Sequence, residues 1–145
     1  MKDCRKRKVL FLCTGNSCRS QMAEGWTRAL LGRGVDAYSA GVETHGLNPC
    51  AVRVMKEAGV DITGQESQHV DEFRDLAPDL VVTVCTSAAE RCPVLPGAKR
   101  TVHHSFRDPA GAEGTEDEIL AVFRSVRDEV RDYVRQLPDL LVENP

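Results

Sequence analysis

The stretch CTGNSCRS, from Cys13 to Ser20, places two thiols, a glycine, an asparagine and an arginine in one short segment. Gly15 relieves the steric limit on φ, and Asn16 is one of the few side-chain-bearing residues that tolerate the left-handed region. A loop of this kind can point successive backbone N–H groups at a single anion. The guanidinium of Arg19 would add a planar fork of donors that matches a tetrahedral oxyanion. We therefore predict a loop that binds phosphate or a phosphate mimic.

Cys13 opens this loop and is the expected nucleophile. A thiol near a helix N-terminus or beside an arginine ionises more readily than a free thiol, and the thiolate is the reactive form. Ser20 could donate a further hydrogen bond to the sulfur. The alternative is a buried cysteine at the end of a strand, next to a surface arginine. The anion contacts are expected from consecutive residues, namely Thr14, Gly15, Asn16, Ser17, Cys18, Arg19 and Ser20.

Alternating strand and helix patterns surround the loop. Residues 8–13 form a continuous apolar strand before it, and residues 17–32 read as a helix that ends at Gly32. Asn48 and Pro49 have the order of a helix cap and a first-turn proline. Further strands are predicted over residues 35–41, 79–85 and 100–104, and further helices over 49–59 and 116–137, the last with its apolar residues at helical spacing.

Strands separated by helices predict an α/β fold, a four-stranded parallel sheet with helices on both faces. No linker or repeat divides the 145 residues, so we expect a single domain over residues 1–145. In such sheets ligands bind at the carboxyl ends of the strands, and the loop begins at one of these ends.

The composition excludes several functional classes. A net charge of −3 gives no argument for nucleic acid, and the basic lead-in KDCRKRK is expected to be a solvated approach to the first strand rather than a binding patch. The first apolar run is too short for a membrane span or a secretory signal, so we expect a cytoplasmic protein that makes no membrane contact. Six cysteines should then be free thiols.

No metal site is expected from the sequence. There is no C-x2-C pair, and the histidines do not pair with cysteines at zinc spacing. His45, His103 and His104 are expected to be loop or strand-end residues, and Trp26 to pack on a helix face. We expect no catalytic role for Cys4 or Cys50.

The loop sequence CTGNSCRSQMAEGW, with YSAGVETHGLNP, DLVVTVC and FRDPAG further along, resembles the low-molecular-weight protein tyrosine phosphatase fold. In detail it is similar to the thioredoxin-coupled arsenate reductases built on that fold. Two features depart from the phosphatases. The segment after Asp108 and Pro109 lacks the adjacent aromatic residues that line a phosphotyrosine site, and CTSAAERC adds Cys85 and Cys92 after the third strand.

The resemblance implies a redox relay that uses Cys13, Arg19, Cys85, Cys92 and Asp108. Cys13 would attack the arsenic of arsenate while Asp108 helps to protonate the departing oxygen. Cys85 would then attack Cys13 and release arsenite, and Cys92 would move the disulfide to Cys85 and Cys92. Thioredoxin would reduce that disulfide, with glutaredoxin or a low-molecular-weight thiol as alternative donors.

Simpler interpretations of the same residues remain open. Cys85 and Cys92 could be small core residues, Asp108 could cap a turn, and Cys18 could pack beneath the loop. A short helix over residues 86–91 would have to unwind before Cys92 could reach Cys85. As whole functions, a phosphatase of the same fold and an arsenite-binding thiol protein are the alternatives.

No tightly bound cofactor is expected, and we expect a monomer. Some relatives bind potassium near the loop, and Asn16, Glu24 and Ser39 match the residues that they use. Glu66 and Gln68, however, stand where those relatives carry threonine and aspartate.

Overall fold

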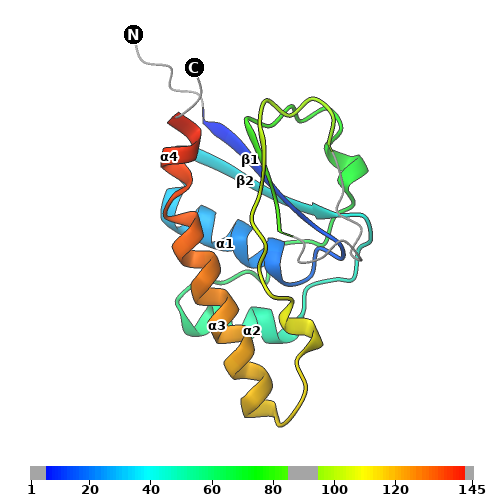
Figure 1. Ribbon diagram of the computed structural model, residues 1–145, viewed down its shortest axis with the longest axis vertical. Coiled ribbons are helices and arrows are strands. Elements are labelled where there is room, and N and C mark those ends of the chain that lie inside the picture. The colour runs from blue at the N-terminus through cyan, green and yellow to red at the C-terminus, as the bar shows by residue number, and fades with distance from the viewer. Residues whose placement is uncertain (1–5, 85–94, 143–145) are drawn as a thin grey trace.

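The computed structural model describes residues 6–84 and 95–142 (Figure 1). Four parallel strands form one sheet in the order β2-β1-β3-β4. The strands are β1 (Arg7–Cys13), β2 (Val35–Gly41), β3 (Leu80–Thr83) and β4 (Thr101–His103), and the helices are α1 (Arg19–Leu31), α2 (Pro49–Glu57), α3 (Glu116–Val134) and α4 (Leu137–Val142). Two short 3₁₀ helices, η1 (Val70–Phe73) and η2 (Pro109–Gly111), lie in the connections. The predicted α/β class with a four-stranded parallel sheet is confirmed.

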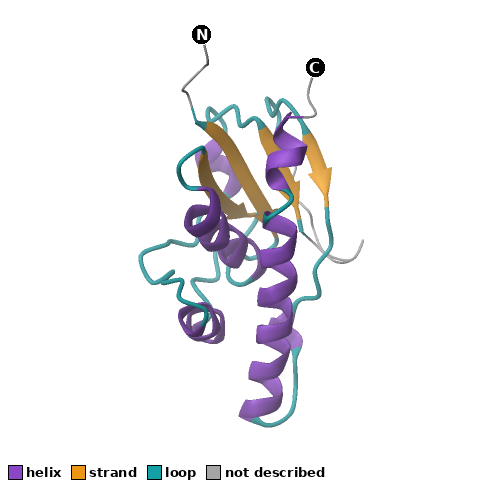
Figure 2. Cartoon of the chain, turned by 90° about the vertical axis from the view of Figure 1, so that its left-hand side faces the viewer, coloured by secondary structure: helices purple, strands orange, loops and turns teal. Residues whose placement is uncertain are grey.

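Strand β1 is the buried centre of the fold because its side chains alternate between two cores. Val9 and Phe11 are fully buried in the larger core with α1, α2, α3 and α4. Figure 2 shows the helices packed beside the sheet. Leu10 and Leu12 belong to the smaller core on the opposite face. Within the described residues, that face is covered by η1 and by the connecting segments on either side of β3.

The helix ends mostly follow the predicted capping chemistry. The side chain of Asn48 accepts hydrogen bonds from the backbone N–H groups of Cys50 (2.8 Å) and Ala51 (3.4 Å), with Pro49 as the first helical residue. Trp26 packs on a helix face as expected: it is 5% exposed, and its indole N–H donates to the carbonyl of Arg127 at 3.1 Å. This bond joins α1 to α3.

Most predicted boundaries agree with the structure to within one or two residues, and the end of the last helix differs by more. The last helix ends at Val134 instead of Leu137, and α4 begins at Leu137 with Pro138 in its first turn, a position that needs no N–H donor. Helix α1 begins at Arg19, two residues later than predicted. Strand β3 spans Leu80–Thr83, although the N–H of Val84 still donates to the carbonyl of Leu12 on β1 (2.9 Å).

Within the described residues, no helix is long and apolar enough to cross a membrane.

Candidate active site

The loop from Cys13 to Cys18 lies between β1 and α1, and neighbouring segments hold its carbonyl groups. Segments after β2 and before η1 donate to three of them: Thr14 accepts from the N–H of Glu43 (3.0 Å), Gly15 from the N–H of His45 (3.0 Å) and the hydroxyl of Ser67 (3.2 Å), and Ser17 from the N–H of Asn48 (3.1 Å). Helix α1 donates to two more, because the side-chain amide of Gln21 bonds the Asn16 carbonyl (3.1 Å) and the N–H of Met22 bonds the Cys18 carbonyl (2.9 Å). In the described part of the chain, the N–H groups of Gly15, Asn16, Ser17 and Cys18 donate no hydrogen bond. The loop therefore keeps a row of backbone donors for an anion.

Asn16 holds the loop in the conformation that the sequence predicted. Its φ is 49°, in the left-handed region, and the residue is completely buried. The side-chain oxygen accepts from the backbone N–H of Gln68 (2.7 Å) and from the amide of Gln21 (3.0 Å), and the side-chain nitrogen donates to the hydroxyl of Ser20 (2.8 Å). These three bonds tie the loop to α1 and to the segment before η1.

The predicted reason for Gly15 is wrong. Gly15 is not among the residues with positive φ. A side chain at this position would instead collide with the imidazole ring of His45. Glycine is needed here so that His45 can approach the loop.

The thiol of Cys13 lies at the end of β1 and is 3% exposed. Its sulfur is 2.9 Å from the hydroxyl oxygen of Ser20. Because that oxygen already accepts from the side-chain amide of Asn16, the hydroxyl proton is available to the sulfur. Ser20 therefore lies where the sequence predicted, with its hydroxyl proton directed at the Cys13 sulfur.

Cys18 has a different environment. It occupies the N-cap position of α1 without a side-chain capping bond and belongs to the larger core. Burial raises the pKa of the Cys18 thiol to about 12, with a smaller opposing effect from its hydrogen bond to Ser17. Cys18 is thus a neutral thiol at physiological pH, so its side chain is unsuited to nucleophilic attack. Its contribution to the loop is its backbone N–H.

Arg19 is 4% exposed and lies beside the carboxyl ends of the strands. One guanidinium nitrogen donates to the carbonyls of Val84 and Phe106, each at 3.3 Å. The other is 3.6 Å from a carboxylate oxygen of Asp108. The guanidinium is therefore held in one orientation by the segments that follow β3 and β4.

Asp108 caps a turn, as the simpler interpretation predicted, and its carboxylate also faces Arg19 at the cavity. One carboxylate oxygen accepts from the backbone N–H of Ala110 (3.0 Å) and so caps η2, while the other faces Arg19. The side chain is 45% exposed. The carboxylate therefore lies between the cavity and solvent.

These groups meet around one cavity of about 340 Å³. Its lining contains Cys13, Thr14, Gly15, Ser17, Cys18, Arg19, His45, Asp108 and Ala110. His45 was expected only as a loop residue, and its position directly after a strand end was the signal that could have placed it here. Of the predicted loop residues, Asn16 and Ser20 lie beneath the cavity and support it.

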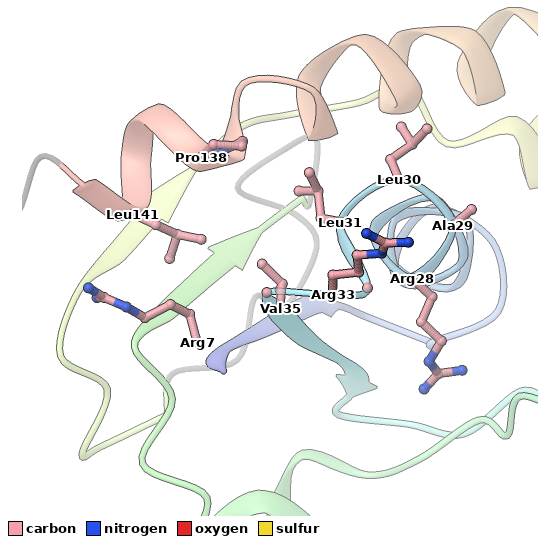
Figure 3. A pocket seen from close by; sticks show the side chains of 11 residues that line it. Arg7, Arg28, Ala29, Leu30, Leu31, Arg33, Val35, Pro138 and Leu141 are labelled. Carbon is pink, nitrogen blue, oxygen red and sulfur yellow. The ribbon is translucent and has the colours of Figure 1, made fainter. Parts of the chain in front are cut away.

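A larger cavity of about 630 Å³ lies at the opposite ends of the strands, between α1 and α4 (Figure 3). Leu30, Leu31 and Leu141 form its apolar part, and arginines such as Arg7 and Arg33 border it. Among the described residues, no cysteine or carboxylate lines this cavity. It shares no lining residue with the site around Cys13.

Two predicted site residues, Cys85 and Cys92, lie outside the described residues, and so does the predicted helix over residues 86–91. Val84 is the last described residue before them, and its carbonyl contacts Arg19.

The residues that match a potassium site have other partners. Ser39 donates to one carboxylate oxygen of Glu24 (2.6 Å), and Arg28 pairs with the other. Burial raises the pKa of Glu24, and the contacts from Ser39 and Arg28 oppose this effect. The side-chain oxygen of Asn16 already accepts two hydrogen bonds. A potassium ion here would have to compete with Arg28 for the carboxylate.

The family model described as low molecular weight phosphotyrosine protein phosphatase matches residues 8–144. The chain therefore belongs to the low molecular weight phosphotyrosine protein phosphatase family, as the sequence resemblance predicted.

Individual proteins similar to this chain are named by a specific activity, which the family description does not give. The arsenate reductase of Halalkalibacterium halodurans is 57% identical over 130 residues, which cover 90% of this chain and 94% of that protein. The arsenate reductase of Bacillus subtilis is 50% identical over 131 residues, again 90% of this chain and 94% of that protein. A solved structure described as an arsenate reductase in the phosphate binding state has a TM-score of 0.79 and 33% identity, covering 93% of this chain and 98% of that chain. The predicted similarity to arsenate reductases is thus confirmed.

Proposed function

We propose that this protein reduces arsenate to arsenite. The observation that carries the proposal is the Cys13 thiol, which is hydrogen-bonded to Ser20 and lines a cavity beside a row of loop N–H donors and Arg19. Arsenate has the shape and charge of phosphate, so this cavity suits it. Relatives that are half or more identical to this chain are named arsenate reductases, and a structural neighbour is described in a phosphate-bound state.

The first step is attack of the Cys13 thiolate on arsenic, with loss of one arsenate oxygen as water. Asp108 supplies a proton to that oxygen, since its free carboxylate oxygen faces Arg19 at the cavity. Arg19 and the loop N–H groups stabilise the remaining negative oxygens. The product is a Cys13 thioester of arsenic(V).

The electron transfer follows when Cys85 attacks the sulfur of Cys13. The electron pair of the sulfur–arsenic bond passes to arsenic, which leaves as arsenite, and a disulfide joins Cys13 and Cys85. Cys92 then attacks Cys85, which frees the Cys13 thiolate and leaves a disulfide between Cys85 and Cys92. A dithiol donor, for which we propose thioredoxin, takes up this oxidation. Glutaredoxin and low-molecular-weight thiols are the competing donors.

A coupled assay tests the function and the donor together. NADPH oxidation is followed in the presence of arsenate, thioredoxin and thioredoxin reductase, and then with glutaredoxin or glutathione in place of thioredoxin. We expect turnover that depends on arsenate and is fastest with thioredoxin. Stoichiometric binding of arsenite with no catalytic loss of arsenate would identify an arsenite-binding protein instead.

The order of the relay is tested by trapping. A Cys92→Ser variant should release one arsenite per protein and retain a Cys13 to Cys85 disulfide, whereas Cys85→Ser should stop at the Cys13 adduct. Peptide mapping by mass spectrometry detects both species. If the Cys92 variant contains no link between Cys13 and Cys85, the order is wrong.

The family membership favours a phosphatase as the second candidate. Against an aryl phosphate as substrate, the residue that lines the cavity after Asp108 is Ala110, which offers no aromatic surface to a phenyl ring. Hydrolysis of p-nitrophenyl phosphate without any thiol reductant tests this candidate. We expect this rate to be far below that of arsenate reduction.

A further inference from the structure

The proposed reaction gives no role to His45, the histidine that lines the cavity. His45 follows β2, whereas Asp108 and Ala110 follow β4, and these strands lie on opposite sides of β1 in the sheet. The loop from Cys13 to Cys18 follows β1, which lies between β2 and β4 in the sheet order. His45 and Asp108 therefore border the cavity from opposite edges of the sheet.

His45 is tied to the loop through its backbone, and its half-exposed imidazole is paired with Glu43. Its Nε2 atom is 2.7 Å from a carboxylate oxygen of Glu43, and its backbone N–H donates to the carbonyl of Gly15. The ring lies so close to Gly15 that Nδ1 would be the first atom to meet an added side chain. Because an ionised carboxylate only accepts hydrogen bonds, Nε2 carries the proton shared with Glu43, and Nδ1 faces the loop.

The other described histidines have different partners away from the cavity. They are His69, which caps η1 and pairs with Asp71; His103, which contacts Thr83 and Ser105; and His104, which stacks on Tyr133. Only His45, within the described residues, combines a carboxylate partner with a position in the cavity lining.

We propose that His45 is a substrate-positioning residue that hydrogen-bonds an outer oxygen of the bound oxyanion through Nδ1. The proton of that bond lies on Nδ1 or on the oxyanion, since phosphate and arsenate both retain an O–H at neutral pH. Glu43 acts through His45 by fixing the ring over Gly15. The choice of arsenate as the reacting oxyanion rests on the proposed function, whereas the contact itself is tested with phosphate.

The experiment measures how well inorganic phosphate protects Cys13 of the full-length reduced protein from iodoacetamide. His45→Ala and His45→Phe should each need about tenfold more phosphate for half-protection, because a hydrogen bond to a charged group is lost. Glu43→Ala should need about threefold more phosphate for half-protection. Glu43→Gln keeps an acceptor for Nε2, so the phosphate concentration that it needs should be close to that of the unmodified protein. Asp71→Asn removes the carboxylate of the other histidine pair and should change nothing.

The phenylalanine variant separates a hydrogen bond from a steric wall. It keeps an aromatic ring over Gly15 but has no nitrogen, so normal protection by phosphate in this variant overturns the proposal. Circular dichroism and the rate of alkylation without phosphate show whether each variant is folded. If His45→Ala and His45→Phe both fail to fold, Glu43→Ala and Glu43→Gln decide the matter, and equal protection in these two would overturn it.

Steady-state kinetics with arsenate provide a second readout. In the His45 variants the KM for arsenate should rise about tenfold while kcat stays within about twofold, because the contact is present in the bound state as well as the transition state. A fall in kcat with unchanged KM would contradict a positioning role. If phosphate protection depends on His45 but the unmodified protein does not reduce arsenate, the proposed function is wrong and this inference stands.

Discussion

The hydrogen bond between Ser20 and Cys13 predicts how reactive the nucleophile is. In the structure, the Ser20 hydroxyl lies 2.9 Å from the Cys13 sulfur and accepts from the Asn16 amide at 2.8 Å. Replacing Ser20 by alanine leaves the sulfur without its donor. A hydrogen bond to a charged group contributes about 1.5–3 kcal/mol, and about 1.4 kcal/mol corresponds to a factor of ten. The reactivity of the Cys13 sulfur toward an electrophile should therefore fall about tenfold.

Alkylation by iodoacetamide at pH 6.5 measures the reactivity of this sulfur. The rate at Cys13, followed by peptide mass spectrometry, should fall about tenfold in Ser20→Ala. Ser17→Ala is the matched control, since the Ser17 hydroxyl contacts Cys18 and not Cys13. The Asn16 amide loses its acceptor in Ser20→Ala, which should also lower the free energy of unfolding by about 1–3 kcal/mol. An unchanged alkylation rate in a folded Ser20→Ala protein would refute the role of this bond.

Gly15→Ala should lower the free energy of unfolding by about 1–3 kcal/mol in urea denaturation, because the new methyl group overlaps the ring of His45, and adding His45→Ala should recover most of the loss. Burial lowers the pKa of His104, so the folded protein binds a proton there less readily than the unfolded chain does. The melting temperature should therefore fall as the pH drops below about 6.5. His104→Phe should reduce this change of melting temperature with pH. Because Arg28 already pairs with Glu24, the rate of arsenate turnover should differ by less than about twofold between potassium and sodium salts. In Arg28→Ala, the turnover rate should depend on potassium. A strong potassium dependence of the unmodified protein would contradict the pairing.

Much of the fold could be predicted because its signals are local. The apolar residues of β1 allow little except a buried strand, and the residues 35–41 of β2 were predicted with the observed bounds. Asn48 and Pro49 marked the start of α2 through the hydrogen bonds that a helix N-terminus needs. The end of α3 was missed because residues 135–137 continue the helical pattern, and the break depends on how α4 packs into the core.

The sequence by itself determined the chemistry of the loop. A thiol, an arginine and an asparagine at this spacing between a strand and a helix are suited to an oxyanion, and the left-handed Asn16 and the Ser20 contact to Cys13 agree with that expectation. These features were accessible because the interacting residues lie within a few positions of one another along the chain.

The tertiary structure alone decided what surrounds the loop. Parallel strands bring their carboxyl ends to one edge, so His45 from one side of the sheet and Asp108 from the other meet the loop although they are distant in sequence. The same packing explains why Gly15 must be glycine, since the constraint is the ring of His45 rather than the backbone of Gly15 itself. Contacts of this kind depend on the relative positions of whole elements, which no local pattern of residues specifies.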